Sequence, residues 1–278
     1  MIKIISKGLY TTIQDEGRFG YRNIGVPSSG YMDKESAQIA NLILNNPINN
    51  PLIEATLIGP TIKFEESTVI CITGSDFNPM LNENKISLYT AVEVRKGDIL
   101  KINNSSIGSR CYISIKGDIK LDEVLGSKSF YPQINDSSII EKGDKFKFEP
   151  NKDKLNYKST HQEFKLNKNL KVFKGPEFNC LNKGSIDKLI NKEFSIGVNN
   201  RMAYNLKEKI QDGVSSIISS AVIPGTVQLT PSGQMIILHR DCQTTGGYPR
   251  ILQLDEKSLD NLAQLRIGHK IRFEIVTL

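Results

Sequence analysis

Long apolar runs are missing from this sequence of 278 residues. No window approaches the roughly 20 apolar residues that a membrane-spanning helix needs. The first residues, Met1 to Lys7, contain too short an apolar stretch for a signal peptide. We therefore expect a soluble, cytoplasmic protein that does not bind a membrane.

Cysteine and histidine are scarce and dispersed, and tryptophan is absent. The cysteines lie far apart and form no Cys-x-x-Cys pair, so the sequence indicates neither a zinc site nor a disulfide framework. We expect buried free thiols. The histidines share no ligand-like spacing, so we expect structural roles for them and no metal site in this chain. These residues are Cys71, Cys111, Cys180, Cys242, His161, His239 and His269.

Several motifs of nucleotide-binding proteins and hydrolases are absent as well. The sequence has no G-x-x-x-x-G-K-[ST], G-x-G-x-x-G, H-E-x-x-H or G-x-S-x-G motif. A self-contained ATPase, dehydrogenase or hydrolase of these types is therefore not expected.

The formal net charge of +6 does not come from basic clusters. The lysines are scattered singly among Asn, Ile and Asp, without the aromatic residues that accompany them in nucleic-acid-binding surfaces. We therefore expect no nucleic acid partner. A mild positive charge attracts small anions such as carboxylates or phosphate, and it equally serves solubility alone.

Short strand-like segments dominate a composition that is ordinary for a globular protein, with 38% hydrophobic and 24% charged residues. Apolar or alternating runs bounded by Gly, Pro, Asn or Asp predict β-strands joined by turns. Helical patterns are few, and Asp33 is placed to cap one of them. The predicted strands include 68–73, 99–102, 111–115, 235–238 and 270–276, and the predicted helices are 33–44, 185–191 and 258–264.

Three segments of the first half recur in the second half, in the same order and at an offset of roughly 165 to 171 positions. The first pair consists of strand-like runs that end at glycine. Each member of the second pair has the pattern of a β-hairpin, and each member of the third is a glycine turn that leads into a strand. The pairs are IKIISKG (2–8) with LKVFKGP (170–176), 59–76 with 224–241, and RKGDILKI (95–102) with RIGHKIRF (266–273).

Such a repeat predicts two similar β-barrels in tandem, each of which closes its own sheet. We assign residues 1–155 to the first barrel domain, including additional strands such as the one in EKGDKFKF at 141–148, and residues 165–278 to the second. The polar stretch 150–169 is the predicted linker. The predicted fold is therefore mainly β with a few short helices.

Three polar segments, of which the first and the third are rich in glycine, interrupt the strand pattern, at 11–33, 199–206 and 239–251. Loops held by a rigid scaffold often carry functional side chains. The alternative is that these segments are barrel turns in which Thr and Asp cap neighbouring backbone groups. The candidate residues are Asp15, Arg18 and Ser28 in the first segment, Arg201 in the second, and Asp241, Thr244, Thr245, Tyr248 and Arg250 in the third.

The same segments carry a family resemblance that extends from Gly8 to about Gly268. The chain resembles the family of the 5-oxoprolinase C subunit, also called the KipA or allophanate hydrolase subunit 2 family. It departs from the family pattern at NNRMA (199–203), where Asn200 replaces an aspartate, and at Phe19, where proline is frequent. The matching motifs are LYTTIQDEGRFGYRNIGVPSSGYMD (9–33), NLILNNP (41–47), ITGSD (72–76), GSRCYISIKGDI (108–119), VLGSKSFY (124–131), IPGTVQLTPSGQ (223–234) and DCQTTGGYPRI (241–251).

This resemblance implies tandem cyclophilin-like β-barrels and a place in a complex. Family members act with a KipI-like and a LamB/YcsF-like subunit, and together they hydrolyse 5-oxoproline to L-glutamate at the expense of ATP. The ATP site is not located by the sequence. Related domains form the carboxyltransferase part of urea carboxylase, and another member antagonises a KipI kinase inhibitor. The chain has no A-M-K-M type sequence, so we expect no covalently attached biotin.

We expect the site to lie in a cleft that this chain shares with the KipI-like subunit. It would bind a small anionic amide. The arginines would hold the carboxylate or phosphoryl oxygens of the substrate, and hydroxyl side chains would position its polar atoms. An aspartate would serve as a base or orient an arginine, although an Asp–Arg pair is also a common structural clamp. The expected roles are catalysis for Asp15, Arg18 and Asp241, and substrate binding for Ser28, Arg201, Thr244, Thr245, Tyr248 and Arg250.

Overall fold

The computed structural model describes residues 1–151, 153–155 and 164–276. His161 and part of the predicted linker lie outside these residues. The chain divides into two compact units: unit 1 consists of Met1–Arg18 and Asp33–Lys165, and unit 2 of Phe19–Met32 and Leu166–Leu278. The predicted domain limits, 1–155 and 165–278, stay a prediction. No local sequence pattern indicated that the short segment Phe19–Met32 belongs to unit 2.

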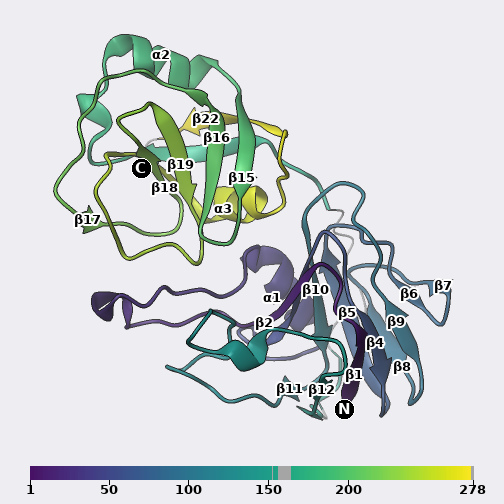
Figure 1. Cartoon of the computed structure of the whole chain (residues 1–278). Coiled ribbons are helices and arrows are strands. Elements are labelled where there is room, and N and C mark those ends of the chain that lie inside the picture. Colours follow the sequence, from purple (N-terminus) through teal and green to yellow (C-terminus); the bar gives the residue numbers. More distant parts are fainter. Residues whose placement is uncertain (152, 156–163, 277–278) are drawn as a thin grey trace. The chain divides into compact units, whose positions relative to one another are not determined.

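Unit 1 contains two antiparallel sheets that share one apolar core (Figure 1). The first sheet has the order β12 (Lys145–Phe146), β1 (Ile2–Ser6), β4 (Thr61–Phe64), β9 (Ile99–Lys101), β6 (Met80–Leu81) and β7 (Asn84–Lys85). The second has the order β2 (Tyr10–Gln14), β3 (Leu52–Thr56), β10 (Arg110–Ile115), β5 (Thr68–Gly74) and β8 (Ala91–Val94). A two-stranded sheet joins β11 (Asp118–Ile119) to β13 (Phe148–Glu149).

Helix α1 (Lys34–Ile43) covers the face of the second sheet that points away from this core. In β3, Ile53 and Ala55 enter the core. Because side chains alternate along a strand, Glu54 points to the opposite face. The side chain of Asp33 accepts a hydrogen bond from the backbone N–H of Ser36 at 3.0 Å, which caps the helix as predicted.

Unit 2 is a closed β-barrel of seven strands. Neighbouring strands are antiparallel, except that the first and last strands of the unit, β14 and β22, pair in parallel. Helices α2 (Lys183–Asn191) and α3 (Glu256–Ala263) and the two-stranded sheet β17 (Ser220–Ala221) and β20 (Thr245–Gly246) complete the unit. The barrel order is β14 (Asn169–Lys174), β21 (Arg250–Leu254), β18 (Thr226–Leu229), β19 (Gln234–Leu238), β16 (Ala203–Lys209), β15 (Phe194–Asn199) and β22 (Lys270–Ile275).

The predicted mainly β fold with a few short helices is confirmed. Barrel closure is found in unit 2, whereas the strands of unit 1 form separate sheets. The predicted helices correspond to α1, α2 and α3 within a few residues. Within the described part of the chain, no helix has the length and apolar character needed to cross a lipid bilayer.

One predicted hairpin, at 59–76, is wrong. Its strands β4 and β5 do not pair with each other: β4 pairs with β1 and β9, and β5 with β8 and β10. The reason is that Ile62 of β4 and Ile72 of β5 enter the same core from different sheets, so the chain crosses between sheets instead of folding back. The corresponding strands of unit 2, β18 and β19, do form the predicted hairpin.

The cysteines depart from prediction at one position. Cys71, Cys111 and Cys242 are buried free thiols as expected, whereas Cys180 is exposed because it ends a short 3-10 helix, Phe178–Cys180, at the surface. Burial raises the pKa of Cys71 to about 12 and that of Cys242 to about 11, so both stay protonated at neutral pH.

Candidate functional site

The first predicted segment is divided between the two units, since Asp15 and Arg18 belong to unit 1 and Ser28 to unit 2. Asp15 directly follows β2, and its carboxylate holds a neighbouring loop. It accepts hydrogen bonds from the backbone N–H groups of Gly17 (2.8 Å) and Lys128 (2.6 Å). The hydroxyls of Ser127 (2.6 Å) and Ser129 (2.5 Å) donate to it as well. Asp15 therefore ties the end of β2 to residues 127–129.

Arg18 lies inside unit 1, with only 1% of its surface exposed. Its Nη2 donates a hydrogen bond to the backbone carbonyl of Ser129, in the loop that also binds Asp15. The two predicted catalytic residues of unit 1 are thus brought together around one loop.

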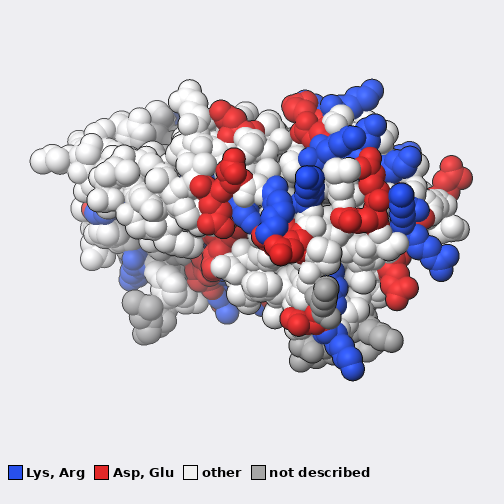
Figure 2. Space-filling view, turned by 90° about the horizontal axis from the view of Figure 1, so that it is seen from below, with Lys and Arg blue, Asp and Glu red and all other residues white. Residues whose placement is uncertain are grey.

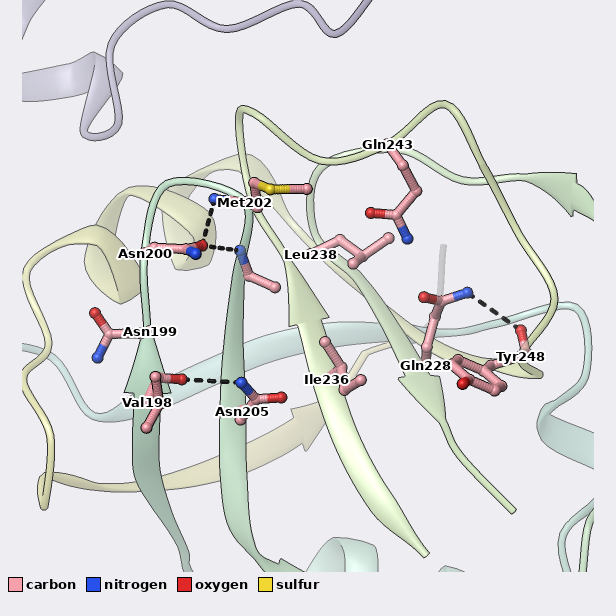
Figure 3. A pocket seen from close by; sticks show the side chains of 11 residues that line it. Val198, Asn199, Asn200, Met202, Asn205, Gln228, Ile236, Leu238, Gln243 and Tyr248 are labelled. Atoms are coloured by element: carbon pink, nitrogen blue, oxygen red, sulfur yellow. Dashed lines mark hydrogen bonds between the residues drawn. The ribbon is translucent and has the colours of Figure 1, made fainter. Parts of the chain in front are cut away.

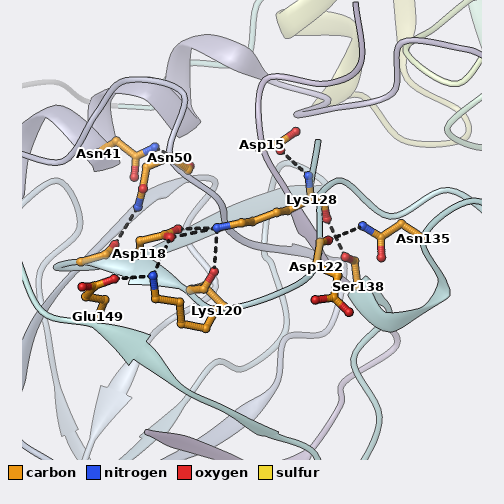
Figure 4. A network of polar contacts seen from close by, with 12 residues as sticks. Asp15, Asn41, Asn50, Asp118, Lys120, Asp122, Lys128, Asn135, Ser138 and Glu149 are labelled. Carbon is orange, nitrogen blue, oxygen red and sulfur yellow. Dashed lines mark hydrogen bonds and ion pairs between the residues drawn. The ribbon is translucent and has the colours of Figure 1, made fainter. Parts of the chain in front are cut away.

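Lys128 anchors this loop from the other side and was missed by sequence reasoning (Figure 4). Its nearly buried ammonium donates to both carboxylate oxygens of Asp118, at 2.8 and 2.9 Å, and to the carbonyl of Ile119. The same carboxylate lies 3.7 Å from Nζ of Lys120, which also pairs with Glu149. A lone lysine between two serines gave no signal of this network.

In unit 2, Arg201 and Asp241 are in direct contact. Arg201 donates from Nε to Oδ2 at 2.7 Å and from Nη2 to Oδ1 at 3.1 Å, and both side chains are buried. Nη2 of Arg201 also donates to the carbonyl of Gly30 at 2.6 Å. The pair therefore joins the turn between β15 and β16, the turn after β19 and the segment Phe19–Met32.

Arg250 has a different partner, Glu177, which sequence reasoning also missed. Its Nη2 lies 2.8 Å from Oε1 and its Nε 3.0 Å from Oε2, while Nη1 donates to the carbonyl of Ala221 at 2.9 Å. The hydrogen bonds from Arg250 lower the pKa of Glu177, and the carboxylate raises the pKa of Arg250. Arg201 and Arg250, the two arginines predicted to bind substrate, are thus both bound to carboxylates of this chain.

A pocket of about 300 Å³ lies on the outer side of the barrel of unit 2 (Figure 3). Tyr204 of β16 and Ile237 of β19 enter the barrel core. Because side chains alternate along a strand, their neighbours Ala203, Asn205, Ile236 and Leu238 point outward, and these residues line the pocket. The lining has no acidic or basic side chain, but it has five carboxamides. It consists of Val198, Asn199, Asn200, Met202, Ala203, Asn205, Gln228, Ile236, Leu238, Gln243 and Tyr248.

Some of these carboxamides are fixed by the backbone. Oδ1 of Asn200 accepts hydrogen bonds from the N–H groups of Met202 (2.8 Å) and Ala203 (3.0 Å). A carboxylate would accept the same bonds, which explains how asparagine replaces the family aspartate. Asn205 donates to the carbonyl of Val198 at 3.1 Å. The side chain of Gln243 has no hydrogen-bond partner among the described residues, so its amide is available to a ligand.

Tyr248 is the one predicted site residue in the pocket lining. Thr244 and Thr245 lie in the segment paired with β17, and Ser28 is half-buried in the segment Phe19–Met32. The structure does not bring these three residues into the pocket, and their predicted roles stay predictions. No group of three His, Cys, Asp or Glu residues suited to a metal ion occurs among the residues described.

Comparison with known proteins assigns the chain to a family. The family model of the carboxyltransferase domain, subdomains A and B, matches residues 24–275. The chain belongs to this family. It is 31% identical to the C subunit of the Escherichia coli 5-oxoprolinase, over 98% of this chain and 90% of that protein. It is 33% identical to the C subunit of the Haemophilus influenzae 5-oxoprolinase, over 100% of this chain and 92% of that protein. The resemblance inferred from the motifs is confirmed.

The same fold occurs in solved structures of longer chains. TTHA0988 superposes with a TM-score of 0.90 at 25% identity, and the match covers 98% of this chain and 55% of that one. The urea amidolyase of Kluyveromyces lactis also gives a TM-score of 0.90, at 28% identity over 99% of this chain and 19% of that one. This chain therefore spans about half of TTHA0988 and about a fifth of the amidolyase.

Proposed function

We propose that this chain is the C subunit of an ATP-dependent 5-oxoprolinase, which hydrolyses 5-oxoproline to L-glutamate with the help of a KipI-like and a LamB/YcsF-like subunit. One observation carries the proposal. The similarity extends over 90% and 92% of two proteins named as C subunits of 5-oxoprolinase, whereas the urea amidolyase match covers 19% of that chain.

The amide-lined pocket of unit 2 suits a small cyclic amide. Its volume of about 300 Å³ is at the lower end for small-molecule sites. In 5-oxoproline, the ring forces the amide N–H and C=O onto the same edge. A carboxamide such as that of Gln243 offers a donor and an acceptor side by side and can pair with this edge. Ile236 and Leu238 provide apolar surface for the ring methylene groups.

The chemistry requires activation of a poor electrophile. In our proposal, ATP transfers its terminal phosphoryl group to the amide oxygen and leaves as ADP. Water then attacks the activated carbon and the ring C–N bond breaks, after which a second water releases the phosphoryl group as inorganic phosphate. In our proposal this chain binds and orients the amide, and Tyr248 adds a hydroxyl at the pocket wall. Arg201 and Arg250 hold the surrounding loops in place, because their guanidinium groups are already bound to Asp241 and Glu177. In the same proposal, Asp15 and Arg18 fix the loop of unit 1 that follows β2.

Reconstitution tests this function. The purified chain is mixed with its KipI-like and LamB/YcsF-like companions, and glutamate formation from 5-oxoproline is measured with and without ATP. We expect ATP-dependent turnover that stops when this chain is omitted. A complete mixture that leaves 5-oxoproline unchanged would contradict the proposal.

A second candidate is the carboxyltransferase role of a urea carboxylase, which the family match and the amidolyase structure favour. Biotin would then be carried by another protein, and biotin-dependent incorporation of bicarbonate into urea would be measured. If the chain binds its KipI-like companion but supports neither reaction, a regulator that antagonises a KipI kinase inhibitor becomes the better assignment.

A further inference from the structure

We propose that a cavity on the outer wall of the barrel of unit 2 binds an oligophosphate, an anion of two or more linked phosphoryl groups. The cavity has a volume of about 500 Å³ and lies where β14, β15 and β22 begin. It shares no lining residue with the amide-lined pocket, so the inference goes beyond the proposed function. The lining consists of Lys168, Asn169, Glu193, Gly268, His269, Lys270, Ile271 and Arg272.

The barrel wall presents polar side chains to this cavity. Ile271 and Phe273 of β22 enter the barrel core. Because side chains alternate along a strand, Lys270 and Arg272 point outward, and both line the cavity. Strand β14 runs parallel to β22 at this end, and its Asn169 lies opposite Arg272. Two basic side chains and a carboxamide therefore face the cavity from adjacent strands.

Basic side chains outnumber acidic ones in this cavity. Elsewhere the two kinds mix: on the face drawn in Figure 2, basic and acidic side chains alternate where charge is dense. In the cavity, the carboxylate of Glu193 lies 3.6 Å from Nζ of Lys270 and 3.2 Å from Nη2 of Arg272. Lys168 has no carboxylate partner among the residues that the structure describes. Three basic side chains thus stand against one carboxylate, which leaves the lining with an excess of positive charge.

The turn before β22 adds an imidazole and is itself ordered. The backbone N–H of Gly268 donates to the carbonyl of Ile196 at 2.8 Å, and the N–H of Ile196 donates to the carbonyl of His269 at 2.8 Å. The N–H of Arg266 donates to Nδ1 of His269 at 3.3 Å, so the neutral ring carries its proton on Nε2 and can donate it to a ligand. Burial and the positive charges of Lys168 and Arg266 lower the pKa of His269. The imidazole therefore lies in the positive field of the cavity.

Competition with Glu193 decides which anions bind here. Its ion pairs with Lys270 and Arg272 are exposed, and exposed pairs contribute little to stability, so a ligand can replace the carboxylate at both cations. A monocarboxylate would exchange one carboxylate for another and lose its translational freedom, so it gains nothing by binding. Linked phosphoryl groups carry several negative charges, accept charge-assisted hydrogen bonds and can engage Lys168 as well. The cavity therefore favours an oligophosphate over a carboxylate.

The phosphoryl groups have two sources, an inorganic oligophosphate or a nucleotide. The lining contains no Phe, Tyr or Trp on which a base could stack, so either ligand would be held by its phosphates. Both therefore belong to one ligand class, which the titrations below divide by source.

Calorimetric titration of the full chain tests the site, with sodium pyrophosphate as the probe. We expect Lys168→Gln and Arg272→Gln each to raise the dissociation constant about threefold, since each removes one exposed charge contact. Glu193→Gln should lower the dissociation constant by about the same factor, because it removes the competing carboxylate. The matched control is Lys257→Gln, which removes an exposed lysine of α3 outside the lining and should leave the dissociation constant unchanged. Thermal melting checks that all variants are folded.

Opposite effects of Glu193→Gln and Lys168→Gln support the cavity as the site. No binding of pyrophosphate by the wild-type chain, or equal weakening by Lys257→Gln, overturns the inference. Displacement of pyrophosphate by an equal concentration of acetate overturns it too, because the site would then accept any anion. ATP and tripolyphosphate, which carry the same number of phosphoryl groups, are titrated in parallel. Equal affinity supports an inorganic oligophosphate as the ligand, and tighter binding of ATP that Arg272→Gln weakens supports a nucleotide.

Discussion

Arg201 and Asp241 form a two-point ion pair inside unit 2, with Nε to Oδ2 at 2.7 Å and Nη2 to Oδ1 at 3.1 Å. They come from two of the three polar segments that the sequence singles out, and they meet across 40 positions of chain. Each side chain is the other's partner, and the predicted roles of Arg201 in substrate binding and of Asp241 in catalysis stay predictions. The pair fixes the turns beside the amide-lined pocket.

Removal of one member of this pair should destabilise unit 2 strongly. Asp241→Ala leaves a buried guanidinium without its carboxylate, and we expect a loss of about 3–5 kcal/mol in the free energy of unfolding. Urea unfolding of the full chain measures it. The control is Glu193→Gln, which removes exposed pairs with Lys270 and Arg272 and should cost about 0–1 kcal/mol. Equal stability of the two variants would contradict the clamp role.

The pair of Arg250 with Glu177 predicts a dependence of stability on pH. Arg250 lowers the pKa of Glu177 in the folded chain below its ordinary value of 4.5. The stabilisation is therefore fully present above that value and is lost as the pH falls through the lowered folded pKa. The melting temperature of Glu177→Gln should lie below that of wild type near neutral pH, and the gap should narrow as the solution is acidified below the ordinary pKa. Calorimetry over this range is the measurement, and a gap that widens on acidification would rule out the pair as its cause.

Substitution of Asp15 would show whether its carboxylate has a structural or a catalytic role. Its four hydrogen-bond donors all come from unit 1, and Asn would place an NH₂ group against some of them. We expect Asp15→Asn to lower stability by about 1–3 kcal/mol. Asp122→Asn is the control, because Asp122 is exposed. A catalytic base would give the opposite result, with turnover abolished in the reconstituted enzyme and the melting temperature unchanged.

Gln243 should contribute to substrate affinity. Loss of one ligand hydrogen bond of about 1.4 kcal/mol corresponds to a rise of about tenfold in KM for 5-oxoproline in Gln243→Ala. Stability should not change, because the Gln243 side chain has no partner among the described residues. Gln211→Ala is the control, since Gln211 is exposed and does not line the pocket. An unchanged KM would place the amide elsewhere.

Local features of the fold were predictable from the sequence. The helix after Asp33 was recognised because a cap and an apolar periodicity lie within a few positions. The hairpin of β18 and β19 was recognised for the same reason, since strand, turn and strand are contiguous. The failed hairpin at 59–76 had equally good local signals. Its two strands belong to different sheets that pack around one core, and no short stretch of sequence shows which sheet a strand joins.

The candidate site was predictable in part. Tyr248 was found because it lies in a glycine-rich loop, but Asn205 and Ile236 point outward from barrel strands, where such residues usually face only water. Glu177 was missed because its arginine lies 73 positions away. Pairing across such distances depends on how the strands close into a barrel. The run without charged residues from Gly213 to Leu238 includes Gln228, Ile236 and Leu238 of the pocket lining. It was the signal in the sequence that could have pointed to the pocket.

The parallel pairing of β14 with β22 sets an order of events during synthesis. Met32 is synthesised early, but its side chain packs in the core of a barrel whose last strand, β22, ends at Ile275. The ribosome must therefore release the chain as far as β22 before this methionine can reach its final surroundings. A nascent chain halted before Lys270 would display the unsealed apolar interior of the barrel to chaperones and proteases.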